Sequence, residues 1–169
     1  MASNKAVWIG NAYGATEPLV MLGKFETGTA IKRGEMLEHT ADTNSSFTPL
    51  ASDLNCSANF AIAAEEVKSA DRMGFYEVYI PRPGDIWRFP LAAAAATAVG
   101  ASMTWSDSQT LTTGGSYAVG YAVGQEHYPL KQGHLTDDAG PDHGETIKSS
   151  AYVDIMVREA ASYYSLFAK

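Results

Sequence analysis

The chain has 169 residues, of which 46% are hydrophobic, so it can bury a sizeable core without disulfides or metals as staples. Its formal net charge of −7 disfavours nucleic acid as a partner, and no basic stripe interleaved with aromatic residues offsets that charge. The single cysteine, Cys56, excludes an intrachain disulfide framework and indicates synthesis in a reducing compartment. No segment is long and apolar enough to span a bilayer, and we expect no membrane partner.

The first thirty residues carry many bulky apolar side chains, broken by glycines and a proline. Neither a helical nor an alternating period persists through them. A segment of this kind either packs along its own domain or lies extended on a partner that supplies its burial. We interpret residues 1–30 as an extended N-terminal arm.

From Ile31 onward the pattern is typical of a β domain, with short runs rich in β-branched and aromatic residues separated by turn clusters. The clearest turn covers residues 81–85, where Pro81 and Pro83 remove backbone donors and Gly84 can adopt a positive φ. It predicts a hairpin or a tight corner. The sequence predicts a mainly β fold with little helix, a small barrel or sandwich, whose strands are expected at 36–39, 60–65, 75–80, 86–89, 102–105, 117–123 and 152–157.

Two segments are ambiguous between helix and strand. Residues 57–68 could form an amphipathic helix with Ser57 as its N-cap, but the segment is short and turn residues follow, which favours a strand. Residues 91–98 are rich in alanine and follow Pro90, so a short helix or an irregular crossover is expected there. Gly120 and Gly124 are interpreted as glycines of a crowded or bulged strand.

A polar excursion at 124–150 offers the best candidates for metal ligands. Their spacing matches neither a zinc motif nor a calcium loop, and a solvated loop explains them as well. Elsewhere there is no nucleophile elbow and no phosphate-binding loop, and on a strand Glu65 and Glu66 would point to opposite faces. We therefore expect no catalytic residues, no metal site and no cofactor. The candidate metal ligands considered for this loop are His127, His134, Asp137, Asp138, Asp142, His143 and Glu145.

The many aromatic residues fit two roles. They could build a stacking platform for a sugar, or they could be strand residues of a core or a subunit interface, where aromatics are enriched. The second role is favoured. The residues weighed are Tyr76, Tyr79, Tyr117, Tyr121, Tyr128, Tyr152, Tyr163, Tyr164, Trp87 and Trp105.

Several of these segments together resemble the decoration, or cement, proteins of tailed-bacteriophage capsids. They are residues 31–37, the strand–Pro-Arg-Pro-Gly-Asp–strand unit at 75–89, the alanine-rich connection, residues 99–113 and residues 117–124. In that family similar segments build a small β-barrel-like (β-tulip-like) domain, which a last strand like 152–157 closes. The motifs are mostly turns and strand edges, and the resemblance extends over residues 31–157, about three quarters of the chain.

The resemblance implies a non-enzymatic virion protein that sits on the outer surface of the capsid, synthesised in the host cytoplasm. It implies a homotrimer at local three-fold positions that stabilises the shell by bridging major capsid subunits. In this interpretation residues 1–30 are the capsid-binding arm, 31–160 the barrel-like domain with the 124–150 loop, and 161–169 a C-terminal tail. The expected capsid contacts are Trp8, Ile9, Tyr13, Leu22 and Phe25.

Two other classes of function stay open. A carbohydrate-binding module would present aromatic residues and the acidic loop to a glycan, and replacing an exposed tryptophan would abolish its binding. A metal-dependent hydrolase would use the acidic loop and would carry bound metal.

Overall fold

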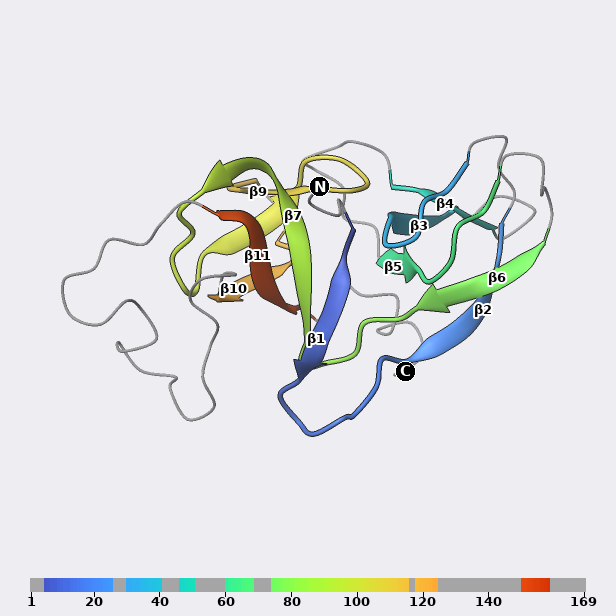
Figure 1. Ribbon diagram of the computed structural model, residues 1–169, viewed down its shortest axis with the longest axis horizontal. Helices are drawn as coiled ribbons and strands as arrows, with labels where there is room; N and C mark the ends of the chain where they lie inside the picture. Colours follow the sequence, from blue (N-terminus) through green and yellow to red (C-terminus); the bar gives the residue numbers. More distant parts are fainter. Residues whose placement is uncertain are drawn as a thin grey trace.

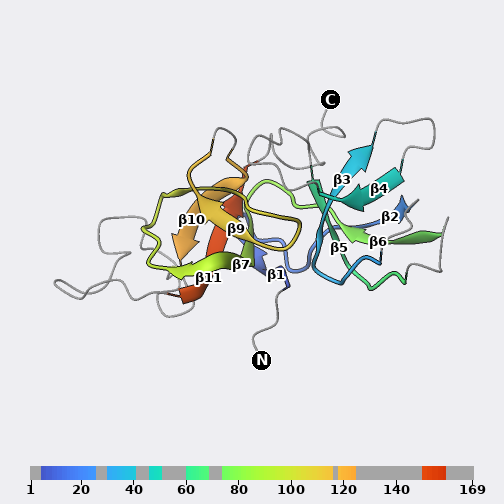
Figure 2. The ribbon, with the colours of Figure 1, turned by 90° about the horizontal axis from the view of Figure 1, so that it is seen from above.

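The computed structural model describes residues 5–25, 30–40, 46–50, 60–68, 74–115, 118–124 and 150–158, and their regular structure is entirely β (Figure 1). The strands form two sheets that lie next to each other along the long axis of the molecule, as Figures 1 and 2 both show. The prediction of a mainly β fold is confirmed.

The first sheet closes into a five-stranded barrel. Its strands follow the order β7 (Asp85–Ala95), β11 (Ser150–Val157), β10 (Gly120–Gly124), β8 (Ser102–Trp105) and β9 (Leu111–Thr113). A parallel pairing of Leu91 with Leu111 joins β9 back to β7. A sixth strand, β1 (Val7–Asn11), pairs with the first residues of β7. The long β7 therefore pairs with three strands, β1, β11 and β9.

The second sheet is antiparallel, in the order β2 (Val20–Lys24), β6 (Phe75–Tyr79), β5 (Phe60–Ala63), β3 (Met36–Thr40) and β4 (Ser46–Pro49). It curls so that its two end strands meet at a bridge between Phe25 and Phe47. Gly23 permits this approach, because a Cβ there would lie 2.6 Å from the Phe47 ring. The curled sheet encloses its own core of Phe25, Ile31, Leu37, Phe47, Ala61, Ala63, Val67, Val78 and Ile80.

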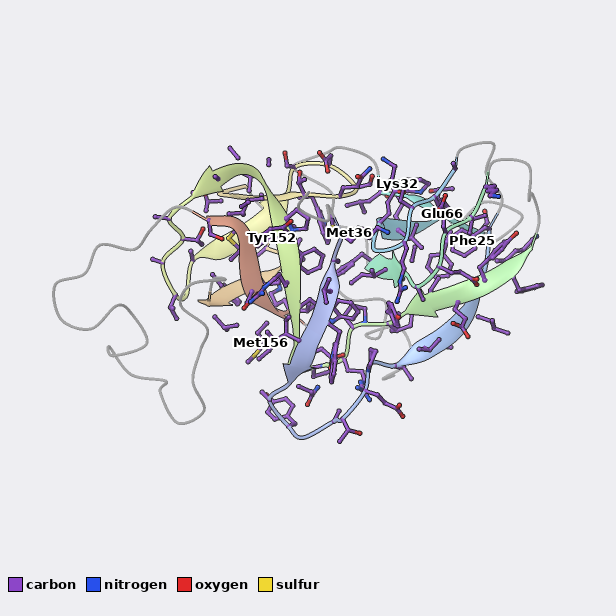
Figure 3. All side chains as sticks on the ribbon, viewed as in Figure 1. Phe25, Lys32, Met36, Glu66, Tyr152 and Met156 are labelled. Carbon is purple, nitrogen blue, oxygen red and sulfur yellow. The ribbon has the colours of Figure 1, made fainter. Side chains whose placement is uncertain are left out.

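β5 links the two cores because it is buried on both faces. Phe60 and Ile62 pack into the barrel core, whereas Ala61 and Ala63 pack into the core of the second sheet. The Phe60 and Trp105 rings meet edge to face with centroids 4.7 Å apart, and Met36 also lies between the sheets (Figure 3). A strand covered on both sides needs no polar alternation, which is why all four residues of β5 are apolar.

Most of the expected strands are present, although their ends shift by a few residues. The expectation of a helix or irregular crossover at 91–98 is wrong: β7 continues to Ala95, which pairs with Ser150. Pairing with two neighbouring strands outweighs the weak helix propensity of a few alanines. Of the two predictions for residues 81–85, the tight corner is confirmed, because the turn joins strands of different sheets. The strands β4 and β9 were not predicted.

The segment expected to be an arm is extended, but residues 5–25 are part of the fold. β1 pairs with β7, and β2 pairs with β6 over Val20–Lys24. Backbone pairing supplies the hydrogen bonds that an isolated extended segment would lack, so the first of the two alternatives, packing along its own domain, holds for these residues. The acidic loop residues from 125 to 149, Cys56, Tyr117 and the 161–169 tail lie outside the described residues.

Gly120 confirms the expectation of a crowded strand. It pairs with Met103 on one side and Val157 on the other, and a bulge separates Ala122 from Gly124. A Cβ at Gly120 would overlap the carbonyl oxygen of Met156, a backbone atom that cannot rotate away.

We therefore expect Gly120→Ala to lower the free energy of unfolding by about 1–3 kcal/mol through overpacking. Urea denaturation measures this change. Gly10→Ala is the matched control, because nothing lies within 4 Å of a Cβ there, and it should stay within about 0.5 kcal/mol of the parent. Equal stabilities for the two variants would contradict the packing described for β10 and β11.

Candidate interaction site at the junction of the sheets

The corner at residues 81–85 carries the chain from β6 of the second sheet to β7 of the first. Gly84 has φ +79°, and a Cβ there would come within 2.5 Å of the Tyr13 ring, so glycine is required both by the backbone and by this contact. The Ala12 amide donates to the Gly84 carbonyl at 2.8 Å. The corner thus packs directly against the connection between β1 and β2.

Asp85 holds the corner through a fully buried carboxylate. Its Oδ1 accepts hydrogen bonds from Asn11 Nδ2 at 2.7 Å and from Trp8 Nε1 at 3.3 Å. Its Oδ2 accepts the Arg82 amide at 2.7 Å, and Arg82 Nε lies 3.5 Å from the same oxygen. A buried charge is tolerated when donors surround it, and here the donors come from β1 and from the 81–85 corner.

Asn11 and Arg82 extend these ties along the β1–β2 connection. Asn11 Nδ2 also donates to the Pro83 carbonyl at 3.2 Å, and its Oδ1 accepts the amides of Tyr13 at 2.8 Å and Ala15 at 3.5 Å. The Arg82 guanidinium donates from Nη2 to the Glu17 carbonyl. The connection is therefore fixed near both of its ends, and β1 and β2 cannot shift independently of the corner.

A pocket of about 330 Å³ opens beside this corner, between β1, β6 and β7. Its aromatic walls are Trp8, Tyr79 and Trp87, and two basic residues, Lys5 and Arg33, also line it. The Tyr79 and Trp87 ring centroids are 5.5 Å apart. The remaining lining residues are small or apolar: Ala6, Val7, Pro18 and Gly34.

The outer face of the β2–β6 pair exposes large apolar side chains. The register places Val20, Leu22 and Lys24 on the same face as Tyr79, Glu77 and Phe75, their direct partners. Leu22 and Phe75 are each 68% exposed, and Val20 is 43% exposed. We call Val20, Leu22 and Phe75 the ribbon face; it adjoins the pocket, because Val20 pairs with the pocket residue Tyr79.

The five expected contact residues fall into different environments. Tyr13 is 78% exposed, and Ile9 and Leu22 are also exposed on the surface. Trp8 is half-buried and packs against the barrel core. Phe25 is 1% exposed inside the second core (Figure 3), so its assignment to a surface contact is corrected: the inward alternation of β2 buries it.

The aromatic residues weighed for sugar stacking are also divided by the structure. Trp87 and Trp105 are buried in the barrel core, as the favoured interpretation expected, and are not available as an exposed platform. Tyr121 is exposed on β10, while Tyr152 is partly buried on β11.

The buried carboxylates of the described residues all accept structural hydrogen bonds. Glu35 accepts the Ser108 hydroxyl at 2.6 Å and the Lys32 amide at 2.8 Å, which ties the second sheet to the β8–β9 turn. Asp154 accepts two bonds from Arg88, at 2.7 and 2.9 Å. Glu65 and Glu66 lie exposed after β5, where the Glu65 carboxylate accepts the Glu77 amide.

Among the residues that the structure describes, no three potential metal ligands come together. The same part of the chain has no helix with the length and hydropathy needed to cross a bilayer. Sequence reasoning missed Val20, Phe75, Lys5 and Arg33, because only the strand register and the close approach of distant loops bring them to this junction. Asp85 could have been found, since it closes the Pro-Arg-Pro-Gly-Asp turn.

No protein-family model, curated protein or solved structure matches the chain.

The Asp85 hydrogen bonds predict a large cost for a substitution that keeps its shape. In Asp85→Asn, one of the two carboxylate oxygens becomes an amide group, which would face a donor in either orientation. We expect the free energy of unfolding to fall by about 2 kcal/mol or more. Chemical denaturation measures this loss. The control is Glu65→Gln, which changes an exposed carboxylate that accepts one hydrogen bond, from the Glu77 amide. Equal losses of unfolding free energy in the two variants would contradict the role of Asp85.

Proposed function

We propose that this chain is a non-enzymatic structural protein that binds other protein subunits through its exposed apolar side chains. From the resemblance stated above, we further propose that these subunits form the shell of a tailed bacteriophage. The protein would then sit on the outer capsid surface as a homotrimer and bridge major capsid subunits.

The observation that carries this proposal is the ribbon face. Leu22 and Phe75 belong to neighbouring strands, and each leaves about two thirds of its surface in water, 68%. Burying such a side chain against a partner stabilises a complex by about 1.5–3 kcal/mol. The backbone of paired strands is already ordered, so binding restricts only the rotamers of these side chains.

Two further properties support a capsid as the partner. A net charge of −7 suits the outer surface of a shell better than an interior lined by DNA. A shell also offers many equivalent sites, so modest contacts at each site of a multivalent protein add up to strong overall binding. A protein that bridges subunits stabilises the shell because it binds the assembled state.

A binding role is favoured over catalysis because the buried carboxylates serve as acceptors of structural hydrogen bonds. Asp85, Glu35 and Asp154 are buried and saturated with hydrogen bonds that hold strands and turns together. A general acid or base needs access to a substrate proton, which these groups lack.

Truncation is not a useful test of the N-terminal segment. Removing residues 2–25 would delete β1 and β2 together with the buried Phe25, and the rest of the fold would lose pairing on both sheets. Substitutions on the ribbon face leave the backbone and both cores intact.

We expect the double variant Leu22→Glu/Phe75→Glu to bind expanded capsids at least about tenfold more weakly than the parent chain. The capsids are those of the phage whose genome carries this gene, and co-sedimentation or cryo-electron microscopy measures occupancy. The matched control is Val99→Glu/Tyr121→Glu, which adds the same charges at two other exposed apolar positions, each 46% exposed. Undiminished binding of the ribbon variant, or an equal loss in the control, would contradict the proposal.

A further inference from the structure

We propose that the pocket between the two sheets binds a small organic anion, an aromatic ring that bears a carboxylate. This inference is independent of capsid binding. It rests on the size of the pocket, its aromatic walls and two exposed lining cations that form no ion pair with any residue that the structure describes.

The size and walls of the pocket suit a small ring. At about 330 Å³ it lies at the lower end of the range of about 300–1,000 Å³ typical of ligand sites. Trp8, Tyr79 and Trp87 supply flat apolar walls, on which an aromatic ring can stack or pack edge to face. Val7 and Pro18 complete an apolar lining that holds no carboxylate.

The cations provide the attraction for an anion. Lys5 and Arg33 line the pocket, both are exposed, and neither forms an ion pair with any residue that the structure describes. The two buried carboxylates closest in sequence to pocket residues, Glu35 and Asp85, already accept hydrogen bonds elsewhere.

Trp87 forms the inner wall of the pocket. Its side chain lines the pocket and is 1% exposed, and its indole Nε1 forms no hydrogen bond with any residue that the structure describes. By contrast, the indole of Trp8 donates to Asp85. A ring that packs against this wall therefore changes the surroundings of the Trp87 indole directly.

The backbone holds the two cations together before any ligand arrives. Gly34 has φ +80°, and a Cβ there would lie 2.8 Å from Lys5 Cβ and 2.9 Å from the Ala6 amide nitrogen. The Ala6 amide donates to the Gly34 carbonyl at 3.3 Å. This close approach brings together the chain segments that carry Lys5 and Arg33, although the two residues are far apart in sequence.

The test titrates the full chain with three aromatic carboxylates: benzoate, phenylacetate and indole-3-acetate. The three indole N–H signals are followed by NMR, after assignment with single Trp→Phe variants. We expect at least one of the carboxylates to shift the Trp87 Nε1–H signal saturably and to leave that of Trp105 in place. Phenylacetamide, which is the same shape as phenylacetate without the charge, should bind more weakly.

The double variant Lys5→Ala/Arg33→Ala should weaken binding by about tenfold or more. The control is Lys68→Ala/Arg158→Ala, which removes the same charges at exposed positions outside the pocket and should leave affinity unchanged. The proposal is overturned if none of the three carboxylates shifts the Trp87 signal, if the amide binds as well as the anion, or if the two double variants behave alike.

Discussion

The whole structure depends on how the chain crosses between the two sheets. It leaves the first sheet after β1, builds the second sheet from β2 to β6, and returns to the first sheet at β7. Both crossings meet at the buried carboxylate of Asp85, which accepts hydrogen bonds from Asn11 on the outgoing side and from Arg82 on the return. The second sheet is therefore an insertion between two neighbouring strands of the first, and the donors around one buried charge hold the insertion in place.

The ribbon face and the pocket both lie next to these two crossings. The ribbon face extends from the end of the outgoing crossing, and the pocket lies between β1, β6 and β7, the strands that flank both crossings. Paired strands and the hydrogen bonds around Asp85 hold the backbone at both surfaces, which lowers the ordering cost of binding. The Glu35–Ser108 hydrogen bond adds a second tie between the sheets, on the β8–β9 turn.

The sequence predicted the fold class and most strands, because turn residues and short β-branched runs are local signals. The split of the β domain into two sheets was not predictable, since a short apolar segment such as β5 does not show which strands it pairs with or which two cores it separates, and its partners lie far along the chain. The surface candidates were only partly predictable. Leu22 and Phe25 look equally apolar in sequence, but strand alternation exposes the first and buries the second. Arg33 and Lys5 meet only through the close approach at Gly34.

Hydroxyl-radical footprinting of the protein on assembled phage shells tests the central claim most directly, because oxidation reports the exposure of each side chain. Leu22 and Phe75 should become protected on binding, while Val99 and Tyr121, which are also exposed before binding, should keep their reactivity. Unchanged oxidation of Leu22 and Phe75 on shells that carry the protein would contradict the account.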